Sequence, residues 1–162
     1  MLLIFIFTGC GYHLPGRGGS LPDDVQSVFV EPIANKTTEP FIETQLTSEV
    51  RDQFSRQQGL DVVMNAERAD ACLKATITSY RSNAISYNTS DDITEYRITI
   101  VVDAELVRTN GEEVIWQGSV QWHEEFSASD DRAAQDYSET QAQEKVHYRL
   151  AQELYNRITD NF

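Results

Sequence analysis

EYRITIVVDAEL, residues 95–106, is the stretch of sequence that decides the fold. Apolar side chains recur at every second position along it, at Tyr96, Ile98, Ile100, Val102, Ala104 and Leu106. The positions between them are largely polar and hold Arg97, Thr99, Asp103 and Glu105. A period of two predicts a β-strand with one face buried in a core and the other face wet or bound to a partner.

Further strands are predicted on both sides of this stretch. Asn110-Gly111 forms a strong two-residue hairpin turn, because both positions tolerate positive φ. The return strand after it continues the buried face with Val114, Trp116, Val120 and Trp122. Upstream, the same kind of pattern predicts strands at Val25–Ile33, Leu60–Met64 and Ala71–Tyr80.

Two helices are predicted from apolar residues that recur every four positions. The first begins near Pro40, capped by Thr38 or Glu39, and its stripe is Ile42, Leu46, Val50 and Phe54. The second follows the loop Ser127–Asp131, and its stripe is Val146, Leu150, Leu154 and Ile158. One-sided helices and a one-sided sheet predict an α+β fold: a two-layer sandwich, with both helices on one face of a mostly antiparallel sheet of four to five strands.

Length, composition and charge limit the class of protein. A chain of 162 residues with 40% hydrophobic residues can bury one core, so residues 25–162 are expected to form a single domain. Thirteen Lys and Arg against 26 Asp and Glu give a net charge of −13. Such a surface repels phosphate backbones at long range, so we expect no nucleic-acid partner.

The first 24 residues predict a lipid-anchored N-terminus. Residues 1–9 run from seven apolar residues into Thr8-Gly9, which is typical of the remnant of a lipoprotein signal peptide. Cys10 is then the lipidation site, carrying acyl chains such as palmitate, and the Gly- and Pro-rich residues 10–24 are the tether. A chance cysteine after a truncated ordinary signal is the alternative.

The second cysteine, Cys72, has a different setting. It lies inside an apolar run, and no other cysteine is near it in the sequence, so we expect a packed free thiol in a strand. A disulfide between Cys10 and Cys72 is the alternative, and it fails if Cys10 is acylated.

Catalytic, metal-binding and cofactor-binding motifs are scarce, so we expect no enzyme, no metal site and no cofactor. His123-Glu124-Glu125 resembles the start of a zinc-binding H-E-x-x-H motif, but Ser127 stands where the second histidine belongs. Neither a Gly-x-Ser-x-Gly elbow nor a phosphate-binding loop is present. Only a spatial cluster of His123 with acidic residues in a closed pocket would favour an enzyme.

A surface for partners is the remaining possibility. A second hairpin tip is expected in the 82–95 region, between the strand at Ala71–Tyr80 and the stretch that begins at Glu95. Tyr80, Tyr87 and Tyr96 lie close to it, and Arg81 and Arg97 flank it. Tyrosine and arginine are the residue types that anchor protein interfaces. The alternative is that the tyrosines are half-buried at the sheet edge with their hydroxyls in water.

Three features resemble the LPS-assembly lipoprotein family LptE. Cys10-Gly11-Tyr12-His13-Leu14 is similar to the lipidated start of its mature chains, and Glu95–Ala104 looks like its central strand. The order of tether, strand, helix, strands and closing helix matches over nearly all of 10–162.

The resemblance implies an outer-membrane lipoprotein on the periplasmic face. It would plug the lumen of the β-barrel translocon LptD, help that barrel to assemble, and aid delivery of lipopolysaccharide to the outer leaflet. Direct binding of anionic lipopolysaccharide would need a local basic cluster in this acidic chain. Our candidates for that cluster are Arg81 with Arg97, or Lys145 with Arg149.

A different class of lipoprotein is the alternative. Val28–Pro32, followed by a helix and then Leu60-Asp61-Val62-Val63, also resembles lipid-anchored regulators of envelope machines, such as activators of peptidoglycan synthases. The short tether argues against them, because residues 10–25 span at most about 50 Å when fully extended.

Overall fold

The computed structural model describes residues 21–111 and 113–160. In chain order its elements are β1 (Ser27–Val30), β2 (Ala34–Asn35), α1 (Ile42–Ser55), β3 (Asp61–Val63), the 3-10 helix η1 (Ala66–Arg68), β4 (Ala71–Tyr87), β5 (Ile93–Arg108), β6 (Val114–Ser127) and α2 (Arg132–Thr159). The described residues do not include Cys10, the predicted signal remnant or most of the predicted tether.

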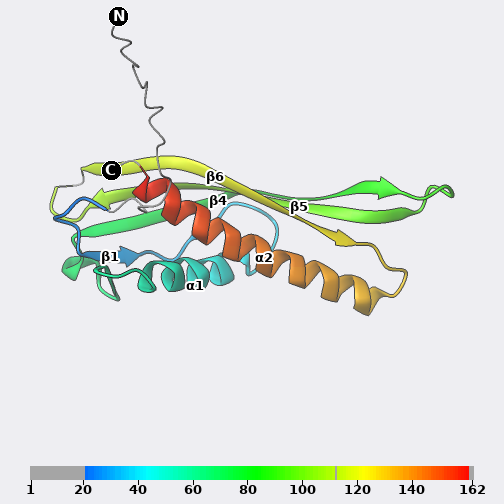
Figure 1. The fold of residues 1–162 in the computed structure, drawn as a ribbon, viewed down its shortest axis with the longest axis horizontal. Helices are drawn as coiled ribbons and strands as arrows, with labels where there is room; N and C mark the ends of the chain where they lie inside the picture. Colours follow the sequence, from blue (N-terminus) through cyan, green and yellow to red (C-terminus); the bar gives the residue numbers. More distant parts are fainter. Residues whose placement is uncertain (1–20, 112, 161–162) are drawn as a thin grey trace, which may run out of the picture.

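The strands form one mixed sheet, and both helices lie on the same face of it (Figure 1). The strand order is β3-β1-β4-β5-β6, and the short β2 also pairs with β4, which gives six strands. β1 runs parallel to β3 and β4, whereas β4, β5 and β6 are antiparallel. The predicted two-layer α+β sandwich is therefore confirmed, with parallel pairing at the β1 side of the sheet.

The core lies between the sheet and the helices, and it contains the predicted stripes. The alternating residues of β5 from Ile98 to Leu106 are buried there, as are all four predicted residues of each helix. Leu21 also belongs to this core, four residues before the predicted start of the domain. Val114 is an exception: it is half exposed, because a register shift between Leu106 and Val107 disturbs its pairing.

The hairpin of β4 and β5 is longer than the sequence predicts. β4 continues to Tyr87 instead of ending near Tyr80, and β5 begins at Ile93. Apolar alternation stops near Ser82 because the end of the hairpin projects past the helices, so that its inner face has little to pack against (Figure 1). The hydrogen-bonded ladder needs no such burial and continues to a turn in which the Asn88 side chain accepts bonds from the amides of Ser90 and Asp92.

The two helix starts differ in how they are capped. Asp131 accepts a bond from the Ala134 amide at 3.0 Å and caps α2, as the loop before it predicts. α1 begins at Ile42, and its N-cap is Phe41 in a left-handed conformation with φ 65°, without a side-chain cap. Asn35 instead holds this connection in place, because its Nδ2 donates to the Glu39 carbonyl at 2.7 Å and to the Glu43 carboxylate at 2.9 Å.

Candidate partner and ligand surface

The outer face of the sheet, defined as the side of β4, β5 and β6 opposite the helices, is not covered by any described element. Strand pairing places these side chains on it: Lys74, Thr76, Ser79, Arg81, Asn83, Glu95, Arg97, Thr99, Val101, Asp103, Glu105, Gln117, Ser119, Gln121, His123 and Glu125. The sequence predicted this face as wet or bound, and polar groups dominate it.

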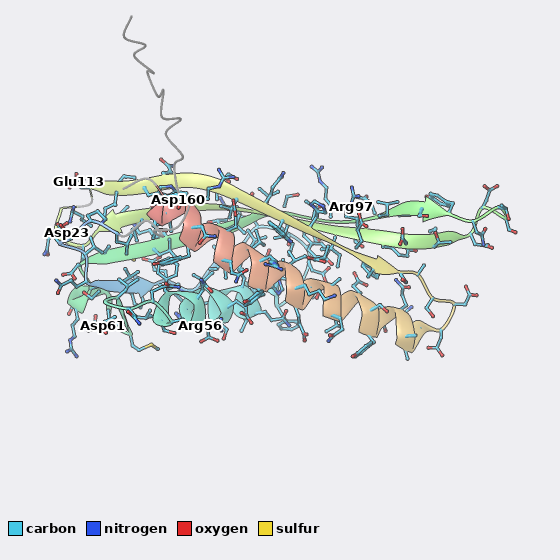
Figure 2. The ribbon with its side chains drawn as sticks, in the orientation of Figure 1. Asp23, Arg56, Asp61, Arg97, Glu113 and Asp160 are labelled. Atoms are coloured by element: carbon cyan, nitrogen blue, oxygen red, sulfur yellow. The ribbon has the colours of Figure 1, made fainter. Side chains whose placement is uncertain are left out.

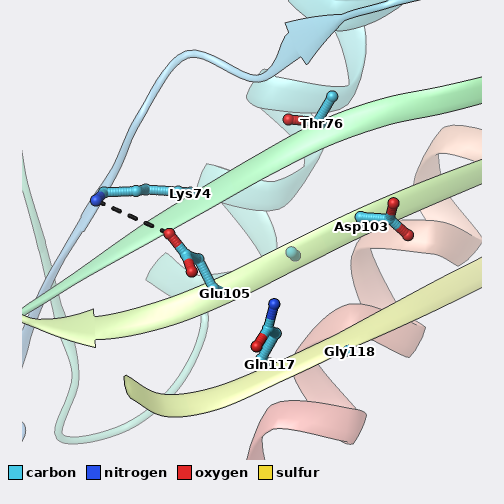
Figure 3. A pocket seen from close by; sticks show the side chains of 7 residues that line it. Lys74, Thr76, Asp103, Glu105, Gln117 and Gly118 are labelled. Atoms are coloured by element: carbon cyan, nitrogen blue, oxygen red, sulfur yellow. Dashed lines mark ion pairs between the residues drawn. The ribbon is translucent and has the colours of Figure 1, made fainter. Parts of the chain in front are cut away.

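A shallow depression of about 340 Å³ marks the β1 end of the outer face (Figure 3). Lys74, Asp103, Glu105 and Gln117 are among the residues that line it. The Lys74 ammonium lies 3.9 Å from the Glu105 carboxylate and so offsets only one of the two acids. The depression is thus acidic on balance and unsuited to a phosphate group.

Arg81 and Arg97 are brought together on this same face. Arg81 pairs with Thr99, and Arg97 lies two residues before Thr99 in β5, so the two arginines are diagonal neighbours on the sheet. Cα atoms of such neighbours are typically about 7–8 Å apart. Arg97 lies on the side away from the helices (Figure 2), where its Nε and Nη2 donate to Glu125 at 3.1 and 2.6 Å. Arg81 has no ion pair with any described residue.

The second predicted basic pair lies in the other layer. Lys145 and Arg149 are exposed on α2, one turn apart. The Arg149 guanidinium lies 6.0 Å from the centre of the Tyr148 ring and donates to Gln152 at 3.1 Å. Because α2 covers the inner face of the sheet, these two cations cannot act together with Arg81 and Arg97 on one small ligand.

The three predicted tyrosines have different environments. The Tyr80 hydroxyl accepts a bond from the Gln143 amide at 2.9 Å and lies 3.3 Å from Glu139, which ties α2 to the sheet, and burial raises its pKa. The Tyr96 ring stacks on Phe126, with 5.4 Å between ring centres. Tyr87 is 59% exposed. Only Tyr87 therefore presents most of its ring to a partner.

An exposed apolar patch lies at the hairpin end, and only Tyr87 of it was named from the sequence. It consists of Ile85, Tyr87 and Ile93, and the last two are opposite each other in the β4–β5 ladder. The polar residues around Ser82 suggested that the strand ends there. A strand continued beyond them would have brought Ile85 and Ile93 onto the hairpin and indicated the patch. A patch on a projecting hairpin is a natural anchor for a protein partner.

The reactive side chains do not assemble into a catalytic centre within the described residues. His123 and Glu125 point to the outer face, whereas Glu124 belongs to the other side and accepts a bond from the Trp122 indole at 3.3 Å. The described residues contain no group of three side chains suited to a metal ion. Cys72 is a buried free thiol, as predicted, and burial raises its pKa to about 12.

A family model described as LptE, lipopolysaccharide-assembly, matches residues 25–162. No curated protein sequence matches the chain. None of the helices in the described part is both long and apolar enough to cross a bilayer.

Solved structures share the fold at low sequence identity. The uncharacterized lipoprotein B of Nitrosomonas europaea has a TM-score of 0.64 at 16% identity, covering 94% of this chain and 92% of its own. The rare lipoprotein B of Shewanella oneidensis has a TM-score of 0.60 at 12% identity, covering 83% and 95%. Protein XCC0632 of Xanthomonas campestris has a TM-score of 0.59 at 16% identity, covering 91% of each chain.

Proposed function

The chain belongs to the LptE family of lipopolysaccharide-assembly proteins, and from this we propose that it is an outer-membrane lipoprotein that plugs an LptD-type β-barrel. It helps this barrel to assemble and aids delivery of lipopolysaccharide to the outer leaflet. The observation that carries the proposal is the family match over residues 25–162, which spans both layers of the sandwich. A domain of this kind acts by binding and not by catalysis.

Two features of the surface support a plug. The polar outer face can lie in a water-filled barrel lumen without costly burial of charge. The exposed patch of Ile85, Tyr87 and Ile93 offers an apolar anchor at the far end of the hairpin. Aromatic residues in such positions dominate interface energies.

Affinity purification of the tagged chain from its own envelope tests the proposal. We expect one large β-barrel at near-equal amounts, identified by mass spectrometry. Tyr87→Asp should lower the amount of co-purified barrel roughly tenfold or more, because it replaces the apolar Tyr87 ring with a charge that the interface would bury. Tyr137→Asp is the matched control, since Tyr137 is also a largely exposed tyrosine and lies on α2. Recovery of a peptidoglycan synthase in place of a barrel would transfer the function to the alternative class.

We also propose that Cys10 carries the lipid anchor, and that residues 1–9 are removed before it. Cys10→Ala should move the protein from the membrane fraction to the soluble periplasmic fraction. The circular dichroism spectrum should stay the same, because the core that the structure describes is formed by residues between Leu21 and Ile158, downstream of Cys10. A Cys10→Ala protein that still sediments with membranes would contradict the anchor.

We propose that Arg81 and Arg97 together bind lipopolysaccharide directly. The exposed Arg97–Glu125 pair is worth little in water and can give way to a phosphate. The double change Arg81→Glu and Arg97→Glu should weaken lipopolysaccharide binding by roughly 10- to 100-fold, the loss expected for charge-assisted hydrogen bonds. Lys145→Glu with Arg149→Glu makes the same change in net charge on the other layer and serves as the control. Equal losses in both double variants, measured by titration calorimetry, would mean that only net charge matters.

A further inference from the structure

β6 forms one free edge of the sheet. It has fourteen residues and pairs with β5 alone, whereas no described strand lies on its other side. Half of its backbone N–H and C=O groups therefore have no ladder partner among the described residues. Such an edge is a ready template for another strand.

The ladder identifies which residues present these groups. The Ala128 amide donates to the Thr94 carbonyl at 2.9 Å, so this opposed pair is hydrogen-bonded. Hydrogen-bonded and non-hydrogen-bonded pairs alternate in an antiparallel ladder. Counting from Thr94–Ala128, the next hydrogen-bonded pairs are therefore Tyr96–Phe126, Ile98–Glu124 and so on in steps of two residues. The even-numbered residues of β6 therefore face β5, and the backbone groups of Gln117, Ser119, Gln121 and His123 face the free edge.

The pairing of β5 with β4 gives an independent check of this assignment. The Thr109 amide donates to the Asp70 carbonyl, next to β4, at 3.0 Å. The backbone groups of odd-numbered β5 residues thus hydrogen-bond to β4. This agrees with the first assignment, in which the backbone groups of even-numbered β5 residues hydrogen-bond to β6. Two separate hydrogen bonds give the same assignment.

This edge lacks the usual protection against pairing. Residues 114–122 contain no charged side chain and no proline, and the register is regular from Trp116 onwards. The opposite edge, β3, has only three residues and carries Asp61. Natural edges are usually short, charged or bulged, so a long neutral edge indicates a strand that is paired in the working assembly.

We propose that β6 is completed by an extended loop segment of the partner barrel protein, since the wall strands of a closed barrel are already paired on both sides. Sheet pairing, and not only side-chain contact, then joins the two proteins. This rests on the proposed function, since it names the surface that the partner uses. The complementary strand is uncharged or basic, because the chain carries a net charge of −13. The same charge argues against a second copy of this chain as the occupant.

Proline substitutions separate backbone pairing from side-chain contact. Ser119→Pro removes one outward N–H and leaves the ladder with β5 intact, which an edge strand tolerates. Ser119→Ala removes the hydroxyl and keeps the N–H. Using the lipidated full chain and its co-expressed LptD-type barrel, we expect Ser119→Pro to lower barrel recovery roughly tenfold and Ser119→Ala to leave it unchanged. Gln121→Pro and Gln121→Ala should repeat this pattern.

Residue-resolved hydrogen exchange on the wild-type chain supplies a second test that needs no variant. Amides of Gln117, Ser119 and Gln121 should exchange quickly in the free chain and become protected in the complex, whereas Trp116, Gly118 and Val120 are protected in both. If the barrel is recovered but these three amides still exchange quickly, the edge pairing is wrong and the proposed function stands. If wild-type chain recovers no barrel, both fail. If the three amides are protected in a dimer of the chain without barrel, the occupant is a second copy and the proposal is overturned.

Discussion

Phe54→Ala is expected to lower the free energy of unfolding by about 3–5 kcal/mol, the range for truncating a buried phenylalanine. Phe54 is fully buried near the end of α1. Its ring meets Tyr155 of α2 edge-on, with 5.2 Å between ring centres and an interplanar angle of 89°. The change therefore removes one aromatic contact between the two helices and leaves a cavity beside the sheet.

Urea denaturation, followed by circular dichroism, measures this loss. Phe41→Ala is the matched control, because Phe41 precedes the same helix but is 74% exposed. It removes the same atoms from the surface and should change stability by no more than about 0.5 kcal/mol. Similar losses in the two variants would contradict the packing described for α1 and α2.

Stability should also fall by about 2–3 kcal/mol between pH 7 and pH 4.5, because of a single histidine. His147 of α2 is 1% exposed, and neither ring nitrogen has a described hydrogen-bond partner. Burial lowers its pKa from 6.5 to about 4. The unfolded chain then binds a proton between these values that the folded chain does not. The contribution is thus fully present above about pH 6.5 and is lost as the pH falls towards 4.

Neighbouring charges do not reverse this direction. Glu49 of α1 and Glu144 of α2 line a pocket beside His147, together with Gln45 and Ser48, and a carboxylate there would favour the charged ring. Burial is the cause of the lowered pKa of His147. His147→Leu should flatten the pH dependence by the stated amount, measured as unfolding free energies at both pH values. An unchanged slope in this variant would assign the acid sensitivity to carboxyl groups elsewhere.

Much of the architecture could be predicted because its signals are local. Alternation along 95–106 describes the buried face of β5, where Ile98, Ile100 and Val102 are all buried. A turn does lie at Asn110-Gly111 between β5 and β6, but the prediction of a two-residue turn is wrong, because the connection runs from 109 to 113 and only Gly111 of the pair has a positive φ, at 133°. The strand and the position of the turn follow from backbone preferences within a few residues, whereas the length of the connection depends on how β5 and β6 pair.

The candidate surface was only partly predictable. Arg81 and Arg97 could be named as cations, but their adjacency depends on the register of two strands joined through a turn at 88–92. His147 lies outside the predicted apolar stripe of the second helix, although its spacing from Ala151 and Leu154 places all three on one buried side. Periodicity around the main stripe could have found it.

The sequence by itself determined which segments become strands and helices, and which side of each is apolar, because period and propensity act over short distances. Only the tertiary structure decided where helices stop covering the sheet, which strand is left at its edge, and which polar groups meet on the outer face. Those features depend on contacts between residues far apart in the chain. For β6, the pattern of Trp116, Val120 and Trp122 indicates a buried face, but nothing in it tells that the strand has only one neighbour.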